Sequence, residues 1–306
     1  MASDDLQLFQ RSDADSDLSV KEREQKIIDK APFAKLKIRD AKILDTIEGR
    51  EICGNCFKSR KFFCYTCCSP VIDEKYIPKV KLPIKIDIIK HAREIDGKST
   101  AIHAAVIAPE DVRIYTYPEF PEISRDEKVV LIFPSKSAQS IEELFTRKVE
   151  DRGRLIEERI QNEFPITRAI FIDSTWHQTK SIYKDQRLRE LCCVVLKSRI
   201  SQFWRHQKSS PRWYLATIEA IHQFLVELHT NAFGAVENYA SEAEIGENAG
   251  AIFTEDEETM RKDSDSSRQK YSGQYDDLLY FFKYMYEKIH SIYDHDKLYA
   301  YKRPLT

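Results

Sequence analysis

The stretch RAIFIDSTWHQTK, residues 168–180, begins with the pattern of a buried strand and continues with that of a helix. An acid, two hydroxyls, an indole and an imidazole follow the apolar run, from Asp173 to His177. In open α/β sheets ligands bind beyond the carboxyl ends of the strands, so this cluster predicts a site. The alternative is a helix cap, with Asp173 or Ser174 as N-cap and Trp176 packed on the core. These residues alone leave both interpretations open.

Strand and helix patterns alternate on both sides of this junction. Short continuous apolar runs predict strands buried on both faces, at 128–133, 168–173 and 191–196. Helical spacing of apolar residues predicts helices over 140–164, from about 175 to 183, from 211 or later through 228, and over 275–293. The order of strand, helix and strand predicts an α/β fold with a parallel sheet.

The composition of the chain is that of an ordinary globular protein. Its 306 residues can bury a substantial core. The acidic start MASDDLQLFQRSDADSD lacks the cationic flank and apolar stretch of a signal peptide, and no apolar run approaches a membrane span. We therefore expect an intracellular, reducing compartment, in which the seven cysteines are poor candidates for disulfides.

The net charge of −2 hides two acidic segments. Residues 1–31 carry a net charge of −3 and residues 241–270 a net charge of −5, which leaves +6 on the rest of the chain. A modest positive charge on the foldable part favours a polyanionic partner through phosphate contacts.

The strongest single motif is CGNCFKSRKFFCYTC, residues 53–67. Two C-x-x-C pairs separated by seven residues can present four thiolates to Zn²⁺, from Cys53, Cys56, Cys64 and Cys67. Cys68 could replace Cys67 as the fourth ligand. A redox pair is the alternative, but neither pair stands at the head of a helix in a βαβ unit. Four thiolates leave no open position, so a structural site is expected.

The spacer between the two pairs carries Lys58, Arg60 and Lys61 among three phenylalanines. Cationic and aromatic side chains on a metal-held loop can contact phosphates and stacked bases, which predicts RNA binding. Alternatively, the bases neutralise the thiolate cluster and the phenylalanines stabilise a small lobe.

Further motifs, in this order along the chain, resemble the DTW-domain family, named for its Asp-x-Thr-Trp motif. They follow the cysteine pairs and are KHAREIDGKST (90–100), LIFPSKSA (131–138), DSTW (173–176) and ATIEAI (216–221). The resemblance covers roughly residues 50–230. Within the family, the chain most resembles the eukaryotic branch, whose members act on tRNA uridine. It implies a SPOUT-like, knotted α/β fold that binds S-adenosylmethionine. The implied reaction transfers a 3-amino-3-carboxypropyl group to uridine N3 of tRNA, and the implied location is the nucleus.

The resemblance also implies individual site residues. The expected cofactor-binding residues are Phe133, Pro134, Ser135, Asp173, Ser174, Thr175, Trp176, Ser201, Thr217 and Glu219. The expected RNA-binding residues, beside the three bases of the spacer, are His91, Arg93 and Arg205. Two positions depart from the family pattern. Ser174 stands where relatives commonly have glycine, and His91-Ala92-Arg93-Glu94 stands for the family's HPxE.

The implied chemistry gives Asp173 a physical role. Uridine N3 is a weakly acidic imide whose proton a carboxylate can remove as general base, and the carbon that is transferred depends on positioning. Thr175 can orient this carboxylate or a cofactor oxygen, and Trp176 can form a wall of the pocket. His177 follows Trp176 on the helix and is expected to point elsewhere.

Two rival functions remain at this point. A SPOUT-like RNA methyltransferase would share the fold, cofactor and substrate class but transfer another carbon. A nonenzymatic, zinc-containing RNA-binding adaptor would not need Asp173, Thr175 and Glu219 to converge.

The predicted organisation has five parts. They are an acidic, partly disordered segment (1–31), a zinc-knuckle lobe (32–80), the DTW α/β catalytic domain (81–240), an acidic flexible insertion (241–274) and a C-terminal helix that packs on the domain (275–306).

Overall fold

Six parallel strands form the central sheet of the computed structural model, which describes residues 24–151, 154–207, 210–237, 239 and 269–305. Their order is β6-β5-β11-β7-β12-β8, and every neighbouring pair is parallel. The strands are β5 (Lys85–Lys90), β6 (Val112–Thr116), β7 (Val129–Ile132), β8 (Gln139–Ser140), β11 (Arg168–Asp173) and β12 (Cys192–Val195). The predicted α/β class with a parallel sheet is confirmed.

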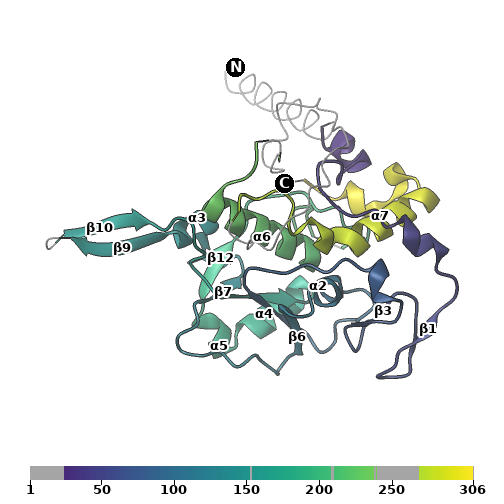
Figure 1. Cartoon of the computed structure of the whole chain (residues 1–306), viewed down its shortest axis with the longest axis horizontal. Coiled ribbons are helices and arrows are strands. Elements are labelled where there is room, and N and C mark those ends of the chain that lie inside the picture. Colours follow the sequence, from purple (N-terminus) through teal and green to yellow (C-terminus); the bar gives the residue numbers. More distant parts are fainter. Residues whose placement is uncertain (1–23, 152–153, 208–209, 238, 240–268, 306) are drawn as a thin grey trace, which may run out of the picture.

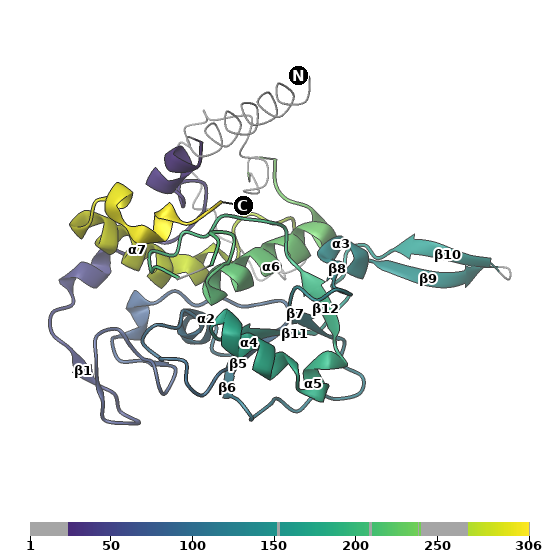
Figure 2. The same ribbon diagram turned by 180° about the vertical axis from the view of Figure 1, so that it is seen from behind.

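Helices cover both faces of this sheet (Figures 1 and 2). Ile86 and Ile88 of β5 belong to a large core that also contains α2 (Ala101–Ile107), α6 (Thr217–Phe233) and α7 (Tyr280–Ile292). Ile89, on the opposite side of β5, joins a smaller core with Ile182 of α4 (Trp176–Tyr183) and Leu188 of α5 (Gln186–Arg189). Burial on both faces explains why the strands read as continuous apolar runs.

The predicted strands at 128–133, 168–173 and 191–196 correspond to β7, β11 and β12, and the predicted helices from about 175 and through 228 correspond to α4 and α6. The predicted elements do not include β5, α2 or β6, although their segments carry the apolar residues of buried elements.

The predicted helix over 140–164 is wrong. Of the residues described in this range, only α3 (Ile141–Leu144) is helical. Strand β9 (Thr146–Asp151) pairs with β10 (Arg154–Arg159) in an antiparallel hairpin that projects from the body (Figure 1). Opposite charges that suit a helical surface also suit cross-strand pairs, as between Arg147 and Glu158 at 2.9 Å. Gly153, between the strands, disfavours a continuous helix.

The predicted zinc-knuckle lobe (residues 32–80), called the cysteine lobe from here on, shares its hydrophobic core with the α/β body. It contains four short strands and two 3-10 helices: η1 (Lys42–Thr46), β1 (Glu51–Ile52), β2 (Ser59–Arg60), β3 (Phe63–Cys64), β4 (Ser69–Pro70) and η2 (Glu74–Tyr76). Phe62 and Phe63 are buried against Phe281 of α7, with ring centroids 6.3 and 4.8 Å away. Helix α7 therefore joins the lobe to the domain, as well as packing on the domain.

Two buried polar clusters tie distant segments to the core. Arg212 forms a two-bond ion pair with Asp29 at 2.8 Å, which holds the helical residues 24–30. Asp276, in η5 (Asp276–Leu279), accepts hydrogen bonds from the hydroxyls of Tyr239 and Tyr271. Tyr271 is fully buried, so the packed chain resumes before the predicted insertion boundary at 274. Residues 1–23 and 240–268, which hold most of both predicted acidic segments, lie outside the described residues.

The chain ends in two short 3-10 turns, η6 (His295–Lys297) and η7 (Tyr299–Lys302). Among the described residues, no helix has both the length and the apolar character needed to cross a membrane.

Candidate active site and metal centre

Asp173 is the last residue of β11 and is 5% exposed. Its Oδ2 accepts a hydrogen bond from Ser99 Oγ at 2.7 Å, and its Oδ1 accepts one from Thr217 Oγ1 at 2.6 Å. Its backbone oxygen accepts a third from the N–H of His91 at 3.0 Å. The segment that follows β5 and the start of α6 thus meet at the carboxyl group of Asp173, at the carboxyl edge of the sheet.

The surroundings of Asp173 keep its pKa above the ordinary value. Burial raises this pKa, and the hydrogen bonds from Thr217 and Ser99 and the charge of Lys90 oppose the rise. Burial and the nearby charge of Asp173 also raise the pKa of Glu94. A carboxyl group with a raised pKa is a stronger base when ionised, which suits proton removal.

The helix cap predicted as the alternative role of Asp173 belongs to another residue. Thr175 is the N-cap of α4, and its N–H donates to Gln178 Oε1 at 3.1 Å. The Ser174 hydroxyl lies 2.8 Å from that of Thr179. Ser99 and Thr217 therefore orient the carboxylate of Asp173, in the role that sequence analysis gave to Thr175. The side chains of Trp176 and His177 lie outside the described part of the structure.

A cavity of about 470 Å³ opens at the carboxyl ends of β7, β11 and β12. Four of the predicted cofactor residues line it: Phe133, Pro134, Ser174 and Thr217. Five residues that were not predicted line it too: Lys197, Ser198, Trp213, Tyr214 and Leu215. Lys197 and Ser198 follow the end of a predicted strand, and that position was the signal that could have found them.

Five of the predicted cofactor residues are not among those that line this cavity: Ser135, Asp173, Thr175, Ser201 and Glu219. Asp173 borders it through its chain neighbours Ile172 and Ser174 and its hydrogen-bond donor Thr217. Glu219 is 1% exposed and accepts hydrogen bonds from Ser201 Oγ at 2.6 Å, Gln202 N at 2.7 Å and Ala216 N at 2.8 Å. It thereby joins the start of α6 to the segment around Ser201. Among the described residues, no hydrogen bond joins Asp173, Thr175 and Glu219, the convergence that an adaptor would not need. Asp173 instead converges with Ser99 and Thr217.

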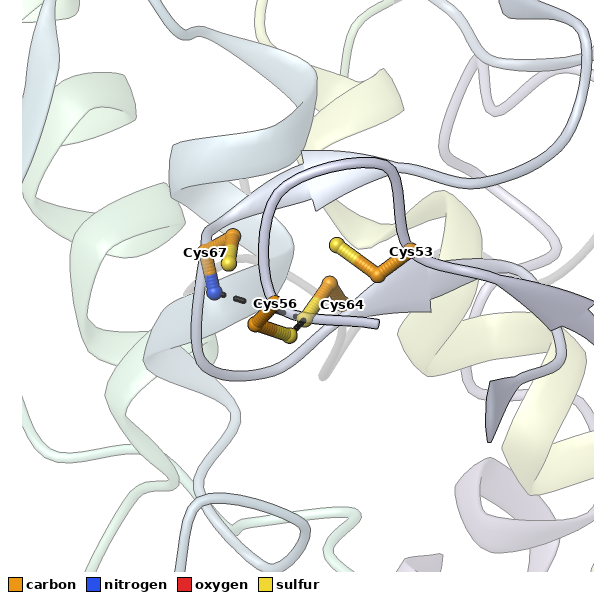
Figure 3. Close-up of side chains that lie close together, drawn as sticks. All are labelled: Cys53, Cys56, Cys64 and Cys67. Atoms are coloured by element: carbon orange, nitrogen blue, oxygen red, sulfur yellow. Dashed lines mark hydrogen bonds between the residues drawn. The ribbon is translucent and has the colours of Figure 1, made fainter. Parts of the chain in front are cut away.

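The four predicted cysteines form one cluster. The Sγ atoms of Cys53, Cys56, Cys64 and Cys67 all lie within 4.8 Å of one another (Figure 3). Tetrahedral zinc with bonds of about 2.3 Å needs sulfur separations of about 3.8 Å, so the cluster fits this ion. Burial raises the pKa of Cys64, but hydrogen bonds from the backbone N–H groups of Cys67 and Thr66 and from the side chains of Cys56 and Arg60 together outweigh burial and lower it to about 6.

The backbone explains why Cys67 and not Cys68 completes the cluster. In the first knuckle, Phe57 N–H donates to Cys53 O at 2.9 Å, and Phe57 has a φ of +58°. In the second knuckle, Cys68 N–H donates to Cys64 O at 3.0 Å, and Cys68 has a φ of +54°. Cys68 thus occupies the left-handed position that closes the turn after a cysteine pair, equivalent to Phe57.

The predicted RNA-binding residues lie in three different settings. Lys58 and Arg93 are exposed, and the ammonium of Lys61 lies 5.3 Å from the ring centre of Phe62. The guanidinium of Arg60 packs 4.7 Å from the ring centre of Tyr65. His91 accepts a hydrogen bond on Nδ1 from the Arg93 N–H at 3.1 Å, and Arg205 donates to Gly97 O at 3.2 Å. Arg60 and Arg205 therefore have structural contacts besides any role with RNA.

The comparison with protein families matches the DTW domain over residues 61–290. The chain belongs to the DTW family. The match includes Asp173 and the cavity, together with the second cysteine pair, and begins after Cys53 and Cys56.

The chain is also similar in sequence to curated proteins that share one name. The chain is 40% identical to mouse tRNA-uridine aminocarboxypropyltransferase 1 over 269 residues, covering 79% of this chain and 77% of the mouse protein. It is 38% identical to the Xenopus tropicalis protein of the same name over 83% of this chain and 85% of that protein. The human protein of that name is 37% identical over 84% of each chain. No solved structure matches significantly.

Proposed function

We propose that this DTW protein transfers the 3-amino-3-carboxypropyl group of S-adenosylmethionine to N3 of a tRNA uridine and releases methylthioadenosine. The observation that carries the proposal is the buried carboxylate of Asp173, oriented by Ser99 and Thr217 beside a cavity at the carboxyl edge of the sheet. The names of the curated relatives support the same reaction and substrate.

The cavity suits S-adenosylmethionine in size and chemistry. Its volume of about 470 Å³ lies in the range of small-molecule sites. Apolar side chains such as Phe133 and Leu196 can contact the adenosine, while Ser174, Ser198 and Thr217 can bond its polar groups. When bound, this cofactor supplies an activated carbon next to a sulfonium. The proposal includes a SPOUT-like, knotted site, which the parallel sheet and the loops gathered at one edge support.

Asp173 removes the proton from uridine N3 in this proposal. Its carboxylate is fixed by two hydroxyl donors, so little reorganisation precedes proton transfer. The raised pKa that burial causes makes the ionised group a stronger base. Its negative charge also favours a cationic sulfonium nearby.

The cysteine cluster holds a structural Zn²⁺ in the proposal, and the surface around it binds tRNA. Phe57 is 76% exposed beside the exposed Lys58, so an aromatic ring and a cation are available for a base and a phosphate. A nuclear location, implied by the family resemblance, completes the proposal.

Labelled S-adenosylmethionine tests the reaction. The protein is incubated with bulk tRNA and cofactor labelled either in the carboxyl group or in the methyl group. Carboxyl label should enter uridine and methylthioadenosine should appear. Incorporation of the methyl label would instead identify a methyltransferase, and binding of tRNA without incorporation of either label would identify an adaptor.

A further inference from the structure

Both ends of the loop formed by residues 91–99 are attached to Asp173. At one end the His91 N–H donates to the Asp173 backbone oxygen, and at the other the Ser99 hydroxyl donates to Asp173 Oδ2. The next residue, Thr100, accepts a hydrogen bond on Oγ1 from the N–H of Ile218 in α6 at 3.2 Å. The conformation of this loop therefore decides whether Ser99 reaches the carboxylate.

The middle of the same loop rests on the cysteine lobe. A Cβ atom added to Gly97 would lie 3.7 Å from the ring of Tyr65, so the Gly97 backbone faces that ring closely. Arg205 donates to the Gly97 carbonyl at 3.2 Å. Within the loop, the Lys98 and Ser99 N–H groups donate to Ile95 O at 2.8 and 3.2 Å.

Tyr65 stands between the two cysteines of the second knuckle, Cys64 and Cys67. Phe63 packs edge-on against its ring with centroids 5.5 Å apart, and the Arg60 guanidinium covers it as well. The position of this ring follows from the knuckle backbone, which a bound metal would hold through Cys64 and Cys67.

We propose that Tyr65 and Arg205 are positioning residues that couple the four-cysteine cluster to Asp173 through residues 91–99. The metal centre thereby sets the geometry of the active carboxylate from outside the cavity. For its effect on turnover this inference rests on the proposed function, whereas its effect on the loop does not.

The coupling has a definite electrostatic sign. The groups that act on Asp173 are Thr217 from α6, Ser99 and Glu94 from the loop, and Lys90 from β5. The Ser99 hydrogen bond lowers the pKa of Asp173. A shift of the loop that breaks this bond and leaves the carboxylate buried raises the pKa of Asp173, so the ionised base is available only at higher pH.

Hydrogen exchange of the loop tests the inference without any measurement of activity. The full chain, loaded with zinc, is compared with the same chain after chelation and with Tyr65→Ala, and the exchange of residues 91–100 is followed. Chelation and Tyr65→Ala should each speed the exchange of the Lys98 and Ser99 amides by about ten-fold or more, because both amides depend on the folded loop. Tyr65→Phe keeps the ring and should restore protection. Unchanged exchange after both treatments would overturn the coupling.

Variants of Arg205 provide a second test of the coupling if Tyr65→Ala loses its metal. Arg205→Gln should speed exchange of the same amides at full zinc content, and Arg205→Lys, which can still donate to Gly97 O, should restore protection. Equal exchange in Arg205→Gln and the unmodified chain would show that Arg205 does not position the loop.

The pH dependence of turnover separates positioning from RNA binding. In Tyr65→Ala and Arg205→Gln, the acid limb of the kcat profile should move to higher pH, as in Ser99→Ala, and tRNA affinity should change less than about three-fold. Adding Ser99→Ala to either variant should shift the acid limb little further, because each single change already removes the hydrogen bond from Ser99 to Asp173. A lower tRNA affinity with an unmoved limb would assign these residues to RNA contact instead. If the unmodified chain transferred no aminocarboxypropyl group, the proposed function would fail while the exchange result would stand.

Discussion

Thr217 donates a hydrogen bond from Oγ1 to Oδ1 of Asp173 over 2.6 Å, although the two residues are 44 positions apart. Thr217 is the first residue of α6, and Asp173 is the last residue of β11. The bond thus joins the start of a buried helix to the end of a central strand. Because Thr217 also lines the cavity, it connects the carboxylate to the space where a ligand can bind.

Asp173→Asn should lower kcat by about a hundred-fold or more, the range typical of a lost general base. The fold should survive, because an amide can still bond the hydroxyls of Ser99 and Thr217. Turnover with bulk tRNA and a thermal melt measure the two effects. Asp185→Asn, at the N-cap of α5 and bonded to Tyr117 and Arg187 instead of Ser99 and Thr217, is the matched control. Normal turnover in Asp173→Asn would exclude Asp173 as the base.

Thr217→Val should move the acid limb of the kcat profile to higher pH. The Thr217 bond lowers the pKa of Asp173, so its loss raises that pKa and leaves less ionised base at any given pH on the limb. A hydrogen bond to a charged group contributes about 1.5 kcal/mol, which corresponds to about ten-fold in turnover on that limb. Thr217→Ser keeps the hydroxyl and should keep the profile. A limb that moves to lower pH would contradict this assignment.

Glu219→Ala should lower the free energy of unfolding by about 3 kcal/mol, because three buried donors lose their acceptor. Chemical denaturation measures this loss, with the exposed Glu190→Ala as a control that should change it by about 0.5 kcal/mol or less. The structure thereby predicts that Glu219 contributes to folding stability and not to cofactor binding. If Glu219→Gln weakened S-adenosylmethionine binding without lowering stability, Glu219 would be a cofactor ligand, as sequence analysis predicted.

Zinc binding should require Cys67 and should not require Cys68. The purified chain should hold about one zinc per molecule by elemental analysis; Cys67→Ala should lose it, and Cys68→Ala should retain it, because Cys68 lies outside the sulfur cluster. Zinc affinity should fall as the pH falls, since the ligand thiols must be deprotonated. Loss of zinc from Cys68→Ala alone would reverse the assignment.

Reversing the charge of Lys58 and Lys61 to Glu should weaken tRNA binding and flatten its salt dependence, because fewer phosphates are neutralised. These two residues are better tests than Arg60, which packs on Tyr65. Arg125 and Lys128 are exposed near the start of β7, at the opposite edge of the sheet from Asp173, and their reversal is the matched control. Equal tRNA affinity of both double variants across a salt series would leave the cysteine lobe with a structural role only.

Local sequence patterns were enough to predict several parts of this protein. Continuous apolar runs indicated strands buried on both faces, and the spacing of Cys53, Cys56, Cys64 and Cys67 indicated the cluster. The polar residues after Ile172 indicated a site at the carboxyl edge. Each of these features depends on a few residues that are close together in the sequence. Burial and short-range geometry restrict which residue types can occur at such neighbouring positions.

Which distant groups meet depends on the three-dimensional packing of the chain. The order of the strands brings Ser99 and Thr217 to Asp173, and no local pattern near residue 99 indicates that contact. The hairpin at 146–159 also needed the structure, because its charges satisfy a helix and a strand pair equally well. Glu219 resembles a ligand in sequence but is turned toward Ser201 in space. Such partners are set by how the chain crosses the sheet, which depends on the packing of the whole core.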